Sequence, residues 1–150
     1  MTHLRTYRID SAWRGPDMAG RTDWIHEFSN AEIGELEIAA DAVIAQDILD
    51  LSADDFDLPQ LDPFLAKVRA DVVDGRGFVL LRGLPVDRWP LERTARVYWA
   101  IGSRVGVPIS QNRVGNLLGH VTDVGGAADH PNQRGHQTSD ALSIHTYIVA

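Results

Sequence analysis

Residues 77–83 read "GFVLLRG". Four consecutive apolar residues, Phe78 to Leu81, stand between glycines, which is the pattern of a strand covered on both faces. The overlapping "DGRGF" contains Gly-x-Gly, but a strand follows it, whereas a phosphate-binding loop needs a helix N-terminus at that point. The stretch therefore predicts a buried β-strand and argues against nucleotide binding.

Helical patterns lie on both sides of this strand. Ser29 and Glu32 form the S-x-x-E capping box of a helix start. The apolar residues that follow recur at roughly helical spacing; they are Ile33, Leu36, Ala40, Val43, Ile44 and Leu51. We expect the acidic turn "SADDFDLP" to end or interrupt this helix.

Two further helices are expected. One starts near Asp62 and Pro63, with Asp as the cap and Pro where its missing N–H costs nothing, and Gly75 stops it. Its buried stripe comprises Leu61, Phe64, Leu65, Val68 and Val72. The last helix begins near Pro90, and Gly106 and Pro108 close it. One face of that helix carries Leu91, Ala95, Tyr98, Ile101 and Val105.

Composition bounds the function. The chain has 150 residues, 44% hydrophobic and 23% charged, as expected of one soluble domain. Its net charge of −7 argues against nucleic acid or an anionic membrane as the main partner. The absence of cysteine excludes disulfides and thiolate metal sites. No signal-like or membrane-spanning segment is recognised, so we expect a cytoplasmic protein.

The predicted organisation has three parts. Residues 1–28 form a polar arm, in which Trp13 and Trp24 are expected to pack onto a body because exposed tryptophans are unfavourable. Residues 29–75 are helical, and residues 76–150 begin a β core. Four of the six histidines follow residue 118, but their spacing matches no compact zinc pattern.

The last ten residues, "ALSIHTYIVA", alternate as a strand does. His145 and Tyr147 share the smaller, more polar face. A His-x-Asp pair here would aim an imidazole and a carboxylate at one point, as two legs of an iron(II) site, but tyrosine stands where the carboxylate would be. From the residues alone, His145 is either a structural strand histidine or a metal ligand. The preceding "RGHQTSD" is a solvated loop or a substrate mouth that includes Arg134, Gln137 and Thr138.

The order of segments is more specific than any single one. It runs through "GRGFVLLRGLPVDRW", "TARVYWAIGSRVGVPISQN", "GNLLGHVTDVG" and "RGHQTSDALSIHT". This order resembles the N-terminal part of the TauD/TfdA-like (taurine dioxygenase-like) iron(II)- and 2-oxoglutarate-dependent dioxygenases. The subgroup that it most resembles carries R-G-x-Q-T-x-x-x-L-x-F-H-T-D, with which the residues up to Thr146 largely agree.

The resemblance implies an α+β fold. Its helical N-terminal part leads into the first strands of a double-stranded β-helix, a jelly roll of the clavaminate synthase-like kind, truncated in this chain. It also implies iron(II) and 2-oxoglutarate as cofactors, and hydroxylation of a small organic substrate. His145 matches the first iron ligand, and Tyr147 replaces the aspartate. The distal histidine and the arginine that holds 2-oxoglutarate would lie beyond Ala150. By this resemblance the chain contains a metal half-site at His145 and no assigned catalytic residue. We therefore expect it to be an inactive fragment.

Three origins of the ending stay open: substitution of the aspartate with a cut chain, a reading-frame change after Thr146, or a short in-frame deletion. A different class of function also stays open. The chain could be a non-catalytic binding or interaction module that retains part of the fold, or a partner chain could supply further strands.

Overall fold

We describe the protein from a computed structural model in which residues 10–110 and 115–119 are described. The chain divides into two compact units, Met1–Pro108 and Ile109–Ala150. The described residues of the second unit form neither helix nor strand. No helix in the described part of the chain is both long and apolar enough to cross a membrane. The elements of the first unit are α1 (Gly15–Met18), β1 (Ile25–Glu27), α2 (Asn30–Ala42), η1 (Ile48–Asp50), η2 (Ala53–Asp55), α3 (Asp62–Val73), β2 (Leu80–Arg82) and α4 (Leu91–Val105).

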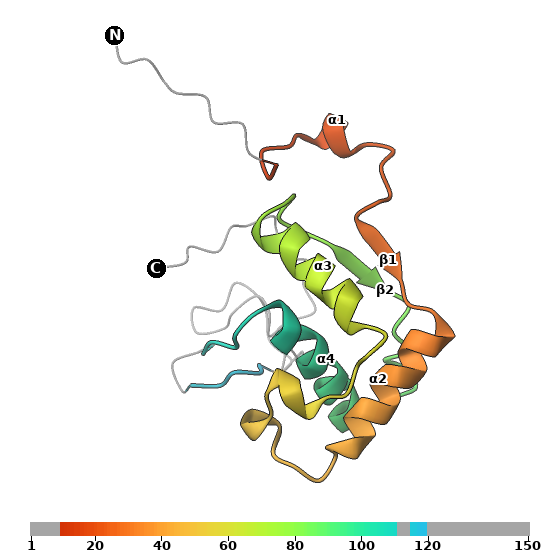
Figure 1. The fold of residues 1–150 in the computed structure, drawn as a ribbon, viewed down its shortest axis with the longest axis vertical. Coiled ribbons are helices and arrows are strands. Elements are labelled where there is room, and N and C mark those ends of the chain that lie inside the picture. Colours follow the sequence, from red (N-terminus) through yellow and green to blue (C-terminus); the bar gives the residue numbers. More distant parts are fainter. Residues whose placement is uncertain (1–9, 111–114, 120–150) are drawn as a thin grey trace, which may run out of the picture. The chain divides into compact units, whose positions relative to one another are not determined.

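The sheet of the first unit is small. Strands β1 and β2 pair in parallel, with Ile25 opposite Leu80 and Glu27 opposite Arg82 (Figure 1). Parallel pairing needs a crossover, and α2 and α3 supply it. The predicted strand in residues 78–81 is confirmed in position, but it begins two residues later, at Leu80. The prediction that it is covered on both faces is wrong, because Leu80 is 41% exposed. The strand starts at Leu80 because this residue pairs with Ile25, the first residue of β1. The Phe78 ring before it packs edge-on against Trp13 and Trp24.

Helix α2 confirms the predicted capping box. The Ser29 hydroxyl accepts from the amide of Glu32 at 3.3 Å, and the Glu32 carboxylate accepts from the amide of Ser29 at 2.7 Å. The predicted continuation to Leu51 is wrong, because α2 ends at Ala42. The buried Arg96 of α4 donates hydrogen bonds to the carbonyls of residues 43, 44 and 46. Because these carbonyls bond Arg96, the chain does not continue as a helix there.

Helix α3 begins where the sequence predicts, but with a different cap. Asp62 is the first helical residue rather than the cap, and its carboxylate accepts from Arg104 at 2.5 Å. The Glu35 carboxylate caps this end from α2, because it accepts from the amides of Gln60 and Leu61 at 2.8 and 3.0 Å. The predicted buried stripe is confirmed at Leu61, Leu65 and Val68.

Helix α4 has the predicted bounds and packs against both α2 and α3. Figure 1 shows it alongside both. The residues that it buries are Arg96, Val97, Trp99, Ala100 and Ile101. The stripe that the sequence groups on one face is divided, because Ile101 is buried whereas Leu91 and Tyr98 are 66% and 65% exposed. Arg104 adds bonds to the carbonyls of Ala53 and Phe56, so α4 also holds the connection between α2 and α3.

Candidate functional site

The residues that the sequence singles out for iron and substrate lie outside the described part of the chain. These are His145 and Tyr147 on the terminal segment, and Arg134, Gln137 and Thr138 in the preceding loop. Their roles therefore stay predictions. The polar groups that the structure does bring together lie in the first unit, where β1 meets α3.

A pocket of about 220 Å³ opens between β1 and α3. The α3 side chains that line it follow helical spacing, so one face of the helix forms the wall. The lining residues are Asp23, Trp24, Ile25, His26, Phe64, Lys67, Val68, Asp71 and Val79. The Trp24 indole nitrogen is buried without a hydrogen-bond partner. The pocket thus combines aromatic walls with carboxylates and a lysine.

His26, one of the lining residues, is held by a ring contact and a hydrogen bond. Its ring stacks on Phe64 with the centroids 3.9 Å apart, and its Nε2 lies 3.0 Å from Glu32 Oε1. The other Glu32 oxygen accepts from Ser29. Burial raises the pKa of Glu32, but the hydrogen bonds from Ser29 and the interactions with His26 outweigh it, so the net pKa is lowered. His26 therefore ties β1 to the start of α2, which is a structural role.

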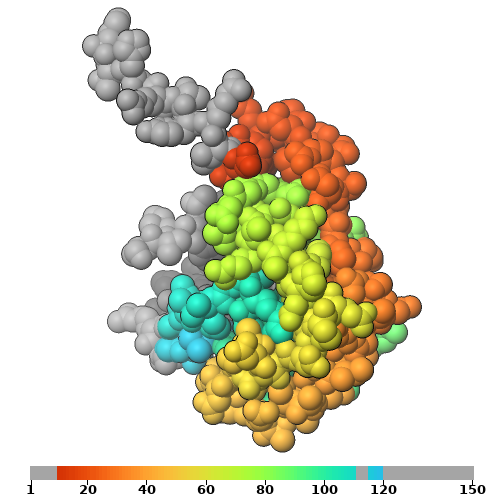
Figure 2. All heavy atoms as spheres, viewed as in Figure 1, coloured from red at the N-terminus to blue at the C-terminus, as the bar shows by residue number. Residues whose placement is uncertain are grey.

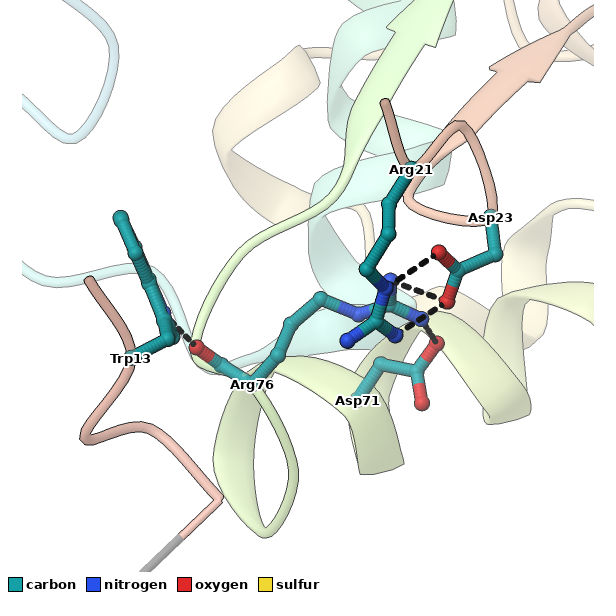
Figure 3. Close-up of polar contacts among 5 residues, drawn as sticks. All are labelled: Trp13, Arg21, Asp23, Asp71 and Arg76. Carbon is teal, nitrogen blue, oxygen red and sulfur yellow. Dashed lines mark hydrogen bonds and ion pairs between the residues drawn. The ribbon is translucent and has the colours of Figure 1, made fainter. Parts of the chain in front are cut away.

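Arg76 is the centre of a charged cluster that includes Asp23 and Asp71 of the pocket lining (Figure 3). Its guanidinium bonds Asp23 at 2.9 Å and Asp71 at 3.2 Å. Asp23 also accepts two bonds from Arg21, at 2.9 and 2.7 Å. The hydrogen bond from Arg21 is the largest of the effects that hold the pKa of Asp23 far below its usual range. Asp23 therefore carries its negative charge at neutral pH, and both Asp23 and Asp71 have a guanidinium partner.

Sequence reasoning missed this cluster. Arg76 and Asp23 are 53 residues apart, and no periodicity links them. A partial local signal exists for Asp71 and Arg76, because they stand five residues apart across the predicted end of a helix. The tertiary contact that makes the cluster appears only once β1 lies beside α3.

The described residues do not provide an iron site. Residues 10–110 and 115–119 contain no group of three or more histidine, aspartate or glutamate side chains able to hold a metal ion. The acids at the pocket pair with arginine, and His26 pairs with Glu32. Asp23, Asp71 and His26, the pocket side chains that could bind a metal, are thus engaged in ion pairs. We assign no metal chemistry to this pocket.

The comparison with protein families gives the class. Residues 43–146 match the family described as "Taurine catabolism dioxygenase TauD, TfdA family". Because the match covers more than half of the chain, the protein belongs to this family, and the resemblance predicted from the segment order is confirmed. Enzymes of this family use iron(II) and 2-oxoglutarate. The matched range runs from the end of α2 through α4 and includes His145.

Two curated proteins are similar to the chain. FR-33289 synthase of Streptomyces rubellomurinus is 23% identical over 139 residues, which cover 91% of this chain and 41% of that protein. Taurine hydroxylase-like protein SAT17 of Stachybotrys chartarum is 29% identical over 99 residues, which cover 65% of this chain and 26% of that protein. The chain thus spans about two-fifths and one-quarter of the lengths of these relatives.

Proposed function

We propose that the chain serves an iron(II)- and 2-oxoglutarate-dependent oxidation of a small organic molecule. The observation that carries the proposal is the family match over residues 43–146, which includes α3, β2 and α4 of the first unit and the segment with His145. In this proposal the first unit is the helical scaffold of the family fold, and the later residues begin its jelly-roll core. Arg134, Gln137 and Thr138 are the candidates for the substrate mouth.

His145 is the residue proposed as an iron ligand. The family match ends at residue 146, one residue before Tyr147. A neutral phenol at this position does not replace an anionic carboxylate, and His145 is the family ligand that the resemblance assigns within these 150 residues. We therefore propose that the 150 residues by themselves do not convert 2-oxoglutarate to succinate.

The test measures iron binding and turnover on the purified 150-residue chain. Iron(II) bound after anaerobic dialysis is compared in the unmodified chain, in His145→Ala and in the matched control His130→Ala. We expect weak binding that His145→Ala removes and His130→Ala retains, with no succinate above the protein-free blank. Binding that is identical in all three proteins refutes the role of His145. Succinate formation that depends on iron and 2-oxoglutarate refutes the proposed inactivity, as does turnover by Tyr147→Asp.

A second candidate is a non-catalytic interaction module. The observation in its favour is that the first unit buries a core of its own, including Leu36, Leu58, Leu61, Leu65 and Val97. This reading expects a sharp, cooperative melt that iron(II) and 2-oxoglutarate leave unchanged. A melting temperature that rises with both cofactors favours the oxygenase proposal instead.

A further inference from the structure

Residues 10–24, which belong to the arm, form no buried core of their own. Their one helix, α1, buries no residue, and Trp13 is 43% exposed. A segment that buries so little must be held by specific contacts. Figure 2 shows the red and orange atoms of the arm against the yellow-green end of α3, which is where those contacts occur.

The contacts at both ends of the arm converge on Arg76 and its neighbour Phe78. At one end, the Trp13 indole N–H donates to the carbonyl of Arg76 at 3.0 Å, and the Trp13 ring meets Phe78 edge-on at 5.0 Å. At the other end, Asp23 accepts from the Arg76 guanidinium. Figure 3 shows Arg76 reaching from its carbonyl beside Trp13 to the carboxylate of Asp23. Arg76 therefore fixes the segment at both of its ends, through its carbonyl at Trp13 and through its guanidinium at Asp23.

The Asp23 contact can open without leaving a charge unpaired. Asp23 keeps the two-bond pair with Arg21, and Arg76 keeps Asp71. Asp23 is also half exposed, so water can take the place of the lost bond. A contact whose partners both have a second partner is suited to reversible opening.

Aromatic surface lies under the arm. Phe78 touches Trp13 on one side and Trp24 on the other, the latter at 5.5 Å. Trp24, Asp23 and Asp71 also line the pocket between β1 and α3. We propose that residues 10–24 form a strap, with Arg76 as its catch, that opens and closes over Phe78 and the mouth of this pocket. The hinge lies at Trp24, whose carbonyl is held by the amide of Leu80 at 2.8 Å.

The test uses the full chain and two readouts. Trypsin cleavage of the Arg14–Gly15 bond reports the open strap, because cleavage follows the population of the open form. Hydrogen exchange at the amide of Leu80 reports whether the sheet stays paired. Arg76→Gln removes the guanidinium charge that pairs with Asp23. The matched control is Arg69→Gln, because Arg69 lies on α3, shortly before Arg76 in the chain, but bonds the carbonyl of Val105.

We expect trypsin to cleave Arg76→Gln faster than the unmodified chain by up to about fivefold, the upper end of the change that one exposed ion pair makes to an equilibrium. Arg69→Gln should cleave at the unmodified rate, and Leu80 should stay protected in both. Raising NaCl from about 0.05 to about 0.5 M should accelerate cleavage of the unmodified chain, because salt screens the ion pair between Arg76 and Asp23. It should not accelerate cleavage of Arg76→Gln, which lacks this pair.

An unchanged rate in Arg76→Gln, or an equal salt effect in that variant, overturns the proposal. If Arg76→Gln loses protection at Leu80, Trp13→Ala decides, since it removes the other attachment and leaves the charges in place. Faster cleavage with Leu80 still protected supports the strap, and an unchanged rate overturns it.

Discussion

Replacing Arg96 tests how α2 is ended. Arg96 is 9% exposed, and its guanidinium donates to the carbonyls of Val43 at 3.2 Å, Ile44 at 2.7 Å and Gln46 at 2.8 Å. Arg96→Met keeps much of the aliphatic volume and removes these three donors. The carbonyls themselves remain and must find other partners.

The expected loss follows from the burial of each acceptor. A hydrogen bond to a charged group contributes about 1.5–3 kcal/mol, and this full range applies to Val43, which is buried. Ile44 and Gln46 are exposed, so water replaces most of their bonds and each adds roughly 0.5 kcal/mol. Arg96→Met should therefore lower the free energy of unfolding by about 3 kcal/mol, a large part of the roughly 5–15 kcal/mol of a typical domain.

Urea denaturation followed by the fluorescence of the buried Trp89 and Trp99 measures this loss. With a slope near 2 kcal/mol per molar urea, the midpoint should fall by about 1.5 M with the slope unchanged. The control is Arg93→Met, because Arg93 lies on the same helix as Arg96 but makes an exposed ion pair with Asp41 of α2. This variant should leave the midpoint almost unmoved. Equal shifts for the two variants would refute the reasoning.

Three further changes have defined outcomes. Glu35→Ala should cost about 1–2 kcal/mol in the same urea assay, because it uncaps two amides at the start of α3; no loss would show that water caps this end equally well. The lowered pKa of Glu32 means that its stabilisation is complete above its ordinary value of 4.5 and declines as the pH falls below it. Ser29→Ala should reduce that acid dependence, and an unchanged pH profile would contradict the capping role. Gly77→Ala should destabilise by about 1–2 kcal/mol because φ is +89° there, whereas Gly102→Ala, in the last turn of α4 where a Cβ meets open space, should stabilise by about 0.5–1 kcal/mol; shifts of the same sign would contradict the assignment to backbone strain.

Local signals predicted α2, α3, β2 and α4 but neither α1 nor β1, and distant partners decided where the predicted helices begin or end. The capping box at Ser29 and Glu32 was predictable because both halves lie within one turn. Leu51 follows the helical period, yet it lies outside α2, because Arg96 captures the chain about fifty residues later. In the same way Asp62 has the residue type of a cap, but Arg104 of α4 binds its carboxylate.

The same difference between local signals and distant contacts decides which candidate sites the sequence could predict. The family was predictable because its segment order is written in the sequence, and the match over residues 43–146 confirms it. His145 and Tyr147 lie outside the described residues, so their pairing in a metal site stays a prediction. The cluster around Arg76 was not predictable, because its members meet only when the arm returns to the end of α3.

The bonds that α4 makes to the connection between α2 and α3 have a consequence for mutational tolerance. Arg96 and Arg104 bind main-chain carbonyls of residues 43–46 and 53–56. A carbonyl is the same in every residue, so these contacts place no demand on the side chains at exposed positions such as Ile44 and Gln46. A saturation library should therefore accept almost any residue at those two positions and very few at the two arginines. The constraint on this loop is thus encoded in a helix some fifty residues away.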